Sequence, residues 1–246
     1  MTEISIELVP RSEKSLRQEL QLVKEHFPAI NRINIPDILR FKMRSWEGCA
    51  IAGESFGNTI PHLRAIDFDP NKPIEIGTKL CVDEIEAVLV ITGDPPQDMA
   101  HKCYRTSCLE MIRRLKREFP QLTIYAGMDP YRNGIKEEID YIKAKQDAGA
   151  EAFFTQPFFD LRLMEIYQGF MQDCTMYWGV SHVLTENSQN YWENKNNAIF
   201  PPDFEPTLAW NRNFAKQAMQ FAETHGDNVY FMPIRTDIAA YLDGIL

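Results

Sequence analysis

The sequence predicts an α/β fold, a (β/α)8 TIM barrel that forms a single domain over residues 1–246. About eight short apolar runs alternate with stretches whose apolar residues recur at helical spacing, the order expected of a parallel barrel. Most of these runs carry a polar residue at or near their C-terminal end. In a TIM barrel the C-terminal strand ends form the active site, so these side chains should converge on one mouth. The pattern therefore predicts an enzyme.

The predicted strands are nearly continuous apolar runs, as expected for parallel strands buried on both faces. In chain order they cover residues 4–8, 30–34, 60–63, 87–91, 122–125, 152–156, 176–181 and 229–231. The helices between them are predicted from apolar residues three or four positions apart. The residues that define these helices are Leu16, Leu20, Val23 and Phe27; Cys108, Met111, Leu115 and Phe119; Ile135, Ile139 and Ile142; Ile166 and Phe170; and Phe214, Ala218 and Phe221.

A few residues indicate where helices begin and end. Ser12 is a predicted N-cap of the first helix, and Gly149 is a predicted exit from the fifth. Residues 46–52 are expected to hold a helix between the second and third strands. The pair Pro201-Pro202 is expected to end one helix, with another beginning after it.

The composition excludes some classes of partner. A net charge of −9 and a pI of about 5.1 argue against a nucleic-acid-binding surface, which is usually basic. The five cysteines are odd in number and show no CxxC spacing, which indicates a reducing compartment. No signal peptide precedes the first strand, and no apolar stretch approaches the roughly 20 residues needed to span a bilayer. We therefore expect a cytoplasmic protein without a nucleic-acid or membrane partner.

Glu7 is the sharpest candidate for catalysis, because it lies between Ile6 and Leu8 in a predicted strand. A carboxylate in a buried strand is costly unless it is paired or used. At the barrel mouth, burial would raise its pKa and keep it protonated near neutral pH, the state of a general acid. Two structural interpretations stay open from the residues alone: an exposed Glu near the chain start, or an ion-pair partner of Arg11.

Two loops after predicted strands carry further candidates. Gly93 allows close approach of a ligand, and the prolines at 95 and 96 stiffen the loop that holds Asp94. The alternative for Asp94 is an ordinary Asp-Pro turn. Gln156 offers amide donors and an acceptor among aromatic residues, which suits a planar ligand rich in heteroatoms.

Other residues are expected to have structural roles. Phe153 is predicted to lie in the core, and Asp160 is predicted to be a helix N-cap. A lone strand histidine such as His62 is more often a satisfied core residue than a ligand. Lys145 is either a solvated helix residue or an anchor for a phosphate.

No metal site is predicted. His101, Cys103 and Cys108 match no standard zinc spacing and are expected to fall on a helix whose Cys108 faces the core. The sequence also has no GxGxxG motif after a strand, no P-loop, and no GxSxG or HExxH motif.

Several motifs occur in the order in which one family carries them. They are SIELVPR at 5–11, IPHL at 60–63, GDPP at 93–96, DAGA at 147–150 and TQPFFD at 155–160. In these motifs the chain resembles the methylenetetrahydrofolate reductases. That family consists of FAD-dependent (β/α)8 barrels that reduce 5,10-methylenetetrahydrofolate to 5-methyltetrahydrofolate. The resemblance is clear over about residues 3–160 and weaker beyond.

The resemblance implies a role for individual residues. Glu7 is implied as the catalytic acid, and Asp94 as a catalytic residue beside flavin and folate. The implied cofactor-binding residues are His62, Thr92, Gly93, Asp94, Tyr125, Asp129 and Lys145. The implied substrate-binding residues are Gln156, Phe158, which would stack on a planar ring, and Arg235. FAD is the implied cofactor, with NADH or NADPH as the electron donor.

The chain departs from the family at positions that contact the cofactor. The differing positions are Asn34-Ile35 for a Thr-Tyr pair, Thr92 for an Arg, Asp129 for a His, Tyr141 for an Asn, and Ala144-Lys145 for an Arg-Lys pair. Several of the lost contacts are to the phosphates and the adenosine half of FAD, whereas Glu7, Asp94 and Gln156 persist.

We therefore expect a methylenetetrahydrofolate reductase with a folate substrate and FAD, in which the protein supplies position and electrostatics. Assembly as a homo-oligomer or with a partner reductase subunit is left open. One alternative is direct reduction by a nicotinamide, without tightly bound flavin. Another is a folate-binding subunit that passes one-carbon groups within a complex. Outside the family, the alternative is a different TIM-barrel enzyme.

Overall fold

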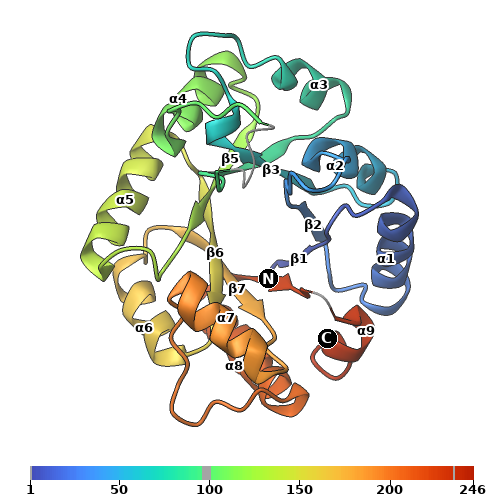
Figure 1. Ribbon diagram of the computed structural model, residues 1–246, viewed down its shortest axis with the longest axis vertical. Helices are drawn as coiled ribbons and strands as arrows, with labels where there is room; N and C mark the ends of the chain where they lie inside the picture. The colour runs from blue at the N-terminus through green and yellow to red at the C-terminus, as the bar shows by residue number, and fades with distance from the viewer. Residues whose placement is uncertain (1, 96–100, 235) are drawn as a thin grey trace.

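Eight parallel strands close into a barrel in the computed structural model, which describes residues 2–95, 101–234 and 236–246 (Figure 1). The strands are β1 (Ile4–Glu7), β2 (Arg32–Ile35), β3 (Thr59–Arg64), β4 (Ala87–Ile91), β5 (Thr123–Met128), β6 (Ala152–Phe158), β7 (Thr175–Ser181) and β8 (Asn228–Met232). Each strand pairs with its neighbours in chain order, and β8 pairs with β1. The predicted (β/α)8 barrel is confirmed, with strand ends displaced by at most three residues.

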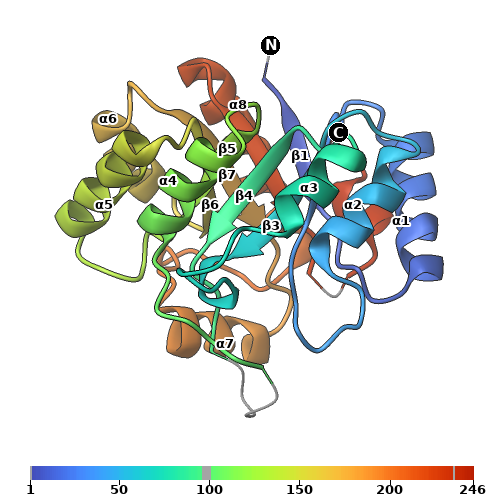
Figure 2. The ribbon, with the colours of Figure 1, turned by 90° about the horizontal axis from the view of Figure 1, so that it is seen from above.

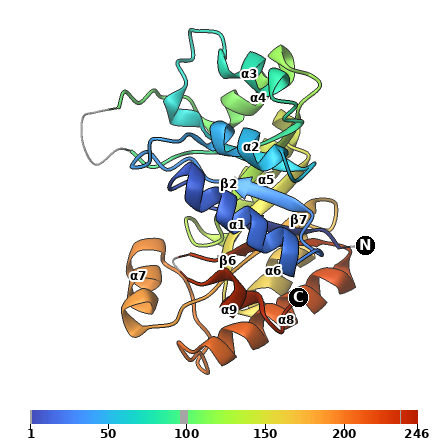
Figure 3. The same ribbon diagram turned by 90° about the vertical axis from the view of Figure 1, so that its right-hand side faces the viewer.

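Helices surround the barrel on its outside (Figures 1 and 2). They are α1 (Glu13–His26), α2 (Ser45–Gly53), α3 (Ile76–Val82), α4 (Cys108–Glu118), α5 (Ile135–Ala148), α6 (Leu161–Phe170), α7 (Glu186–Asn196), α8 (Leu208–His225), α9 (Ile238–Leu242) and the short 3-10 helix η1 (Ala65–Asp67). The views in Figures 2 and 3 show α7 set apart from this ring, at the end of the barrel opposite the N-terminus.

Several predicted helix boundaries are confirmed. The Ser12 side chain accepts a hydrogen bond from the Ser15 amide at 3.1 Å, as an N-cap does. Gly149 ends α5 with a φ of 115°, a conformation that favours glycine. The proline pair does not end a helix as predicted. α7 already ends at Asn196, because Asn197 turns to the left-handed conformation with a φ of 54°, and α8 begins after the prolines.

Two further helix predictions were wrong in part. Ile166 and Phe170 lie in α6 but are 45% and 60% exposed, because the buried face of this helix is formed by Met164 and Tyr167. α4 begins only at Cys108, so the segment with His101 and Cys103 precedes the helix instead of forming part of it.

The apolar residues form an inner and an outer layer. The inner layer fills the barrel and consists of Ile60, Ala87, Leu89, Tyr125, Ala152, Phe154, Tyr177, Tyr230 and Met232. At its centre the rings of Phe154 and Tyr177 stack with 4.0 Å between centroids. The outer layer lies between the strands and the helices. The filled interior separates the mouth, where the strands end, from the opposite end, where they begin. Among the described residues, no helix is both long and apolar enough to cross a membrane.

Candidate functional site

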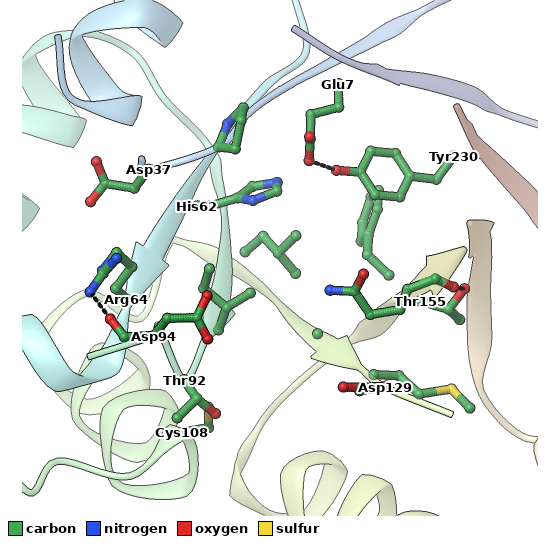
Figure 4. A pocket seen from close by; sticks show the side chains of 18 of the residues that line it. Glu7, Asp37, His62, Arg64, Thr92, Asp94, Cys108, Asp129, Thr155 and Tyr230 are labelled. Atoms are coloured by element: carbon green, nitrogen blue, oxygen red, sulfur yellow. Dashed lines mark hydrogen bonds between the residues drawn. The ribbon is translucent and has the colours of Figure 1, made fainter. Parts of the chain in front are cut away.

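A cavity of about 470 Å³ opens at the mouth of the barrel (Figure 4). Side chains from the ends of six strands and from the loops after them line it, as expected for the active end of this fold. Eight of the residues singled out in the sequence lie in this lining: Glu7, His62, Thr92, Gly93, Asp94, Asp129, Lys145 and Gln156. Residues that are far apart in the sequence therefore meet in one cavity.

Glu7 ends β1 and reaches the cavity beside Tyr230 (Figure 4). The phenol of Tyr230 donates a hydrogen bond to Oε2 of Glu7. Burial raises the pKa of Glu7 to about 7, and the hydrogen bond from Tyr230 opposes that rise. Arg11, one of the partners considered from the sequence, pairs instead with Glu19 at 3.2 Å. The carboxyl of Glu7 can therefore hold a proton near neutral pH.

His62 lies in β3 and faces the same cavity. It is 5% exposed, and its Nε2 has no hydrogen-bond partner among the described residues. Burial lowers the pKa of His62 to about 3, so the imidazole is neutral at physiological pH. A buried nitrogen without a partner is costly, which makes this nitrogen available to a ligand.

The loop after β4 is held by Arg64, a residue that sequence reasoning missed. Its guanidinium donates to the backbone oxygen of Asp94 at 2.6 Å and lies 3.2 Å from a carboxylate oxygen of Asp67. Gly93 has a φ of 84°, and a Cβ there would come within 2.8 Å of the Arg64 side chain. The glycine therefore lets the loop pack closely on Arg64 and leaves the Asp94 side chain exposed at the mouth.

β6 contains a bulge that aims Gln156 into the cavity. Its register against β7 shifts between Phe154 and Pro157, so β6 holds one residue more than its partner strand. The backbone amide of Gly179 donates to the Thr155 hydroxyl at 2.7 Å across this irregularity. Gln156 is exposed and lines the cavity.

The same bulge overturns the prediction that Phe158 stacks on a substrate ring. The extra residue reverses the alternation of the strand, so Phe158 points away from the barrel interior. It is fully buried in the outer layer, with its ring centroid 5.4 Å from that of Trp178.

Tyr125 also lies away from the cavity. The sequence placed the end of its strand at this residue, but β5 continues to Met128, so Gly127 and Asp129 reach the mouth instead. Tyr125 lies at the opposite end of the barrel, where its hydroxyl accepts a hydrogen bond from Arg32 at 3.1 Å. Its prediction as a cofactor-binding residue is therefore wrong. Arg235, predicted to bind substrate, lies outside the described residues.

Lys145 and Asp129 share one wall of the cavity with an ion pair of which only the glutamate is buried. Lys145 is 1% exposed and donates from Nζ to the backbone oxygen of Gly127 at 2.6 Å. Burial lowers its pKa to about 8 and raises the pKa of Asp129. Next to them, Arg132 pairs with the fully buried Glu138 at 2.7 Å. Lys145 is thus a buried residue, which excludes the solvated-helix interpretation.

A second cavity of about 700 Å³ lies beside the first. The two cavities are neighbours because residues two positions apart in the chain line one each. Ile38 and Met232 line the first cavity, and Arg40 and Ile234 line the second. The second cavity is bounded by the start of α7, including Thr185 and Ser188, and by exposed apolar side chains such as Tyr191. No sequence pattern indicated this cavity.

Metal ligands are not grouped in the described part of the chain: it holds no cluster of three or more His, Cys, Asp or Glu side chains placed to bind one ion. The mouth brings together a carboxyl with a raised pKa, a neutral imidazole, an amide and several charged groups. Together with the fold, these groups define a TIM-barrel protein of the enzyme type, with its reactive end at the strand C-termini.

Comparison with known proteins gives the family. The model of the family described as methylenetetrahydrofolate reductase matches residues 47–185, more than half of the 246 residues. The chain belongs to this family. Glu7, Asn34 and Tyr230 lie outside the matched segment.

Two curated relatives show how far the likeness extends. The 5,10-methylenetetrahydrofolate reductase of Buchnera aphidicola subsp. Acyrthosiphon pisum is 28% identical over 117 residues, which cover 47% of this chain and 39% of the relative. The probable methylenetetrahydrofolate reductase (NADPH) of Caenorhabditis elegans is 25% identical over 123 residues, 48% of this chain and 18% of the relative. The matched part of this chain thus spans well under half the length of these relatives.

Solved structures support the fold. An uncharacterized protein from Clostridium thermocellum that binds two copies of 5-methyl-5,6,7,8-tetrahydrofolic acid superposes with a TM-score of 0.67 at 12% identity, covering 99% of this chain and 94% of that chain. A 2,3-dimethylmalate lyase superposes with a TM-score of 0.59 at 9% identity, covering 96% and 75%. At these identities the likeness establishes the barrel fold alone.

FAD, which the family implies, carries a diphosphate that needs cations. Among the described residues, the cavity lining holds three cations, and each is already engaged: Arg64 with Asp67, Arg132 with Glu138, and Lys145 with the Gly127 carbonyl. The same lining holds four carboxyl groups: Asp37 is paired with Arg44, Glu7 has a raised pKa, and Asp94 and Asp129 form no ion pair with a described residue. These residues do not fit the diphosphate half of FAD, since the site offers negative charge where compensation is needed.

Proposed function

We propose that this protein is an oxidoreductase that reduces 5,10-methylenetetrahydrofolate to 5-methyltetrahydrofolate, with Glu7 as general acid. The observation that carries the proposal is the half-buried carboxyl of Glu7 at the mouth, which forms no ion pair with a described residue and whose pKa burial raises to about 7. Membership in the family supplies the substrate class. The Clostridium thermocellum protein supports it, since a barrel of the same fold binds a tetrahydrofolate.

In the proposed reaction Glu7 gives its proton to a nitrogen of the methylene bridge. The bond from that nitrogen to the bridging carbon breaks, which leaves an iminium ion on the other nitrogen. Hydride then adds to the iminium carbon and forms the methyl group. A group with a pKa near the working pH is efficient in such a transfer. The resulting carboxylate regains its proton from solvent.

The remaining residues of the mouth are proposed to bind and orient the folate. Gln156 would pair with the donor and acceptor edge of the pterin through its amide. Asp94 would act by charge beside the ring, and the unpartnered Nε2 of His62 offers a further contact. The second cavity, next to the mouth, gives room for the part of the folate beyond the pterin.

The hydride donor separates two forms of this proposal. The family implies reduced FAD, itself reduced by NADH or NADPH, with His62, Thr92, Gly93, Asp94, Asp129 and Lys145 as the cofactor contacts. The paired cations favour a second form, in which a nicotinamide delivers hydride directly. NADH and NADPH also carry a diphosphate, but a co-substrate that enters and leaves can keep it in solvent outside the cavity, whereas a resident dinucleotide is held through its diphosphate.

The visible absorption spectrum distinguishes the two forms. The purified chain is incubated with excess FAD, desalted and measured. A retained flavin spectrum supports the FAD-dependent form, and a colourless protein supports direct transfer. Formation of 5-methyltetrahydrofolate from 5,10-methylenetetrahydrofolate is then followed by mass spectrometry, with NADH or NADPH, with and without FAD.

A third possibility is a folate-binding subunit that needs a partner for catalysis. It predicts that the purified chain is stabilised against heat by folates but forms no product with any of these donors. A different TIM-barrel enzyme predicts neither product nor stabilisation by folates, because only a specific ligand shifts the unfolding equilibrium.

A further inference from the structure

The strands on both sides of β1 carry uncharged polar residues at positions near Glu7 in the barrel register. Tyr230 comes from β8, which pairs with β1 in a register that sets Ser5 opposite Tyr230. Asn34 comes from β2 and is the direct register partner of Glu7. Both residues are nearly or fully buried, at 3% and 0% exposure. Of the two, only Tyr230 forms a hydrogen bond with the acid, because the side-chain amide of Asn34 has no hydrogen-bond partner among the described residues.

Tyr230 is fixed by packing as well as by its hydrogen bond. Its ring belongs to the inner layer and meets Phe154 edge-on, with 5.2 Å between centroids and planes at 84°. The ring is held in place by this packing, and its hydroxyl donates a hydrogen bond to Oε2 of Glu7 (Figure 4). No hydrogen bond from a described residue goes to Oε1 of Glu7, which lines the cavity with the rest of the side chain.

We propose that Tyr230 is the positioning residue of Glu7: its hydroxyl holds Oε2, so that the carboxyl proton is carried by Oε1 and faces the cavity. This inference rests on the proposed acid role of Glu7. When the Oε1–H bond breaks and the proton forms an N–H bond on the substrate, the charge left on the carboxylate is stabilised by the donor of Tyr230. No electron transfer is involved in this step.

Among the described residues, the groups that face Glu7 from the other elements leave Tyr230 as its specific partner. His62 on β3 is neutral above a pKa of about 3. Asp37, after β2, is paired with Arg44. Asp94, after β4, is exposed at the rim of the mouth. Burial and the Tyr230 hydrogen bond are the two causes of the Glu7 pKa shift, and no charged group among the described residues adds to it.

The chain supplies a matched control at the other end of the barrel. Tyr177 also belongs to the inner layer, and its hydroxyl also donates to a glutamate, Glu3. Replacing either tyrosine by phenylalanine removes one hydroxyl from a ring that stays packed. Only Tyr230→Phe should affect Glu7.

The test is a pH titration of the carboxyl stretch in infrared difference spectra of the full chain, without folate or cofactor. Glu7→Gln identifies the Glu7 band. We expect the wild-type band to titrate near pH 7, Tyr230→Phe to raise this pKa by about one to two, and Tyr177→Phe to leave it unchanged. Equal titration of wild type and Tyr230→Phe would overturn the proposal, and so would the absence of a Glu7 band that titrates near neutrality.

A second measurement decides the case if Tyr230→Phe does not fold. Incorporation of 3-fluorotyrosine makes each phenol a stronger donor while the rings keep their packing, so the pKa of Glu7 should fall. An unchanged pKa would contradict the pairing. Neither titration needs turnover. A chain that reduces no folate would therefore refute the proposed function, while the titrations would still test the role of Tyr230.

In an active chain, Tyr230→Phe should lower kcat, leave KM unchanged and shift the pH profile of the rate to higher pH.

Discussion

A glutamate and a tyrosine form a hydrogen-bonded pair at each end of the barrel, and the two pairs differ by one cation. At the end where the strands begin, Glu3 accepts from Tyr177 and also from Arg32 at 2.7 Å. At the mouth, Glu7 accepts from Tyr230 and has no cationic partner among the described residues. At one end the glutamate is therefore neutralised by an arginine and has a structural role. At the mouth the glutamate has no such partner and can hold a proton.

The difference follows from what burial does to an unpaired carboxylate. At the starting end, the guanidinium of Arg32 satisfies Glu3 and lies 5.7 Å from the ring centroids of Tyr125 and Tyr177. At the mouth, burial of Glu7 without compensation raises its pKa to about 7. Leaving out the cation costs stability and yields an acid, which is the arrangement expected of a functional site.

The largest effect is expected when the acid itself is removed. Glu7→Gln should lower the rate of methylenetetrahydrofolate reduction by about 10²–10⁴-fold, because an amide cannot supply the proton. Binding of 5-methyltetrahydrofolate, measured by calorimetry, should persist. Glu3→Gln, the same change at the other end, should leave the rate per folded molecule near that of wild type. Equal rates for Glu7→Gln and wild type would refute the acid role.

The second prediction concerns stability against pH. The pKa of Glu7 is 4.5 ordinarily and about 7 in the folded protein, so the folded state binds more protons between these values. Stability from this group is therefore present below about pH 4.5 and lost as pH rises to about 7, by about 3 kcal/mol. Burial lowers the pKa of His62 to about 3 and that of His182 to about 4. These two groups therefore increase the stability of the folded protein as pH rises toward 6.5, opposite to the effect of Glu7.

The difference between Glu7→Gln and wild type isolates the contribution of Glu7, because both proteins contain the two histidines. Urea unfolding from pH 5 to pH 8 should show that the free energy of unfolding of the variant increases relative to that of wild type as pH rises. A difference that is constant over this range would mean that the carboxyl is ionised throughout.

Removing the cation from the other end should affect stability rather than chemistry. Arg32→Met leaves Glu3 without its partner, and the expected loss is about 2 kcal/mol, below that of a fully buried pair because Glu3 is partly exposed. Urea unfolding measures it. The rate of folate reduction per folded molecule should not change, and a fall in that rate would show that the two ends are coupled.

The smallest expected effect is that of Tyr177→Phe. It removes one hydrogen bond while Arg32 still compensates Glu3, so the loss should be about 1 kcal/mol, with activity unchanged. Thermal and urea unfolding would detect it. A loss as large as that of Arg32→Met would show that the phenol, and not the guanidinium, holds Glu3 in place.

Much of the fold could be predicted from the sequence because strands buried on both faces and helices with one buried face leave local patterns. Strand 87–91 was predicted with its exact bounds, since it is an uninterrupted apolar run. The prediction that Ile166 and Phe170 mark the buried face of their helix was wrong, because both side chains are exposed although they are apolar. The short helices α3 and α9 left no pattern that distinguished them from loops.

The site was predictable where a residue lies at or near the C-terminal end of a strand, as Glu7, Asp94 and Gln156 do. The site was not predictable where a backbone irregularity or a contact between distant residues determines the position of a side chain. The bulge in β6 turned Phe158 outward, and nothing in the sequence marks its place. The contact of Tyr230 with Glu7 joins residues 223 positions apart, so only closure of the barrel brings them together.

The central claim is that the uncompensated carboxyl at the mouth donates the proton in folate reduction. It is tested most directly by the pH dependence of kcat for conversion of 5,10-methylenetetrahydrofolate to 5-methyltetrahydrofolate by the wild-type chain. We predict a rate that is constant at lower pH and falls tenfold per pH unit above a pKa of about 7, as Glu7 loses its proton. A rate that stays constant or rises up to pH 9 would contradict it.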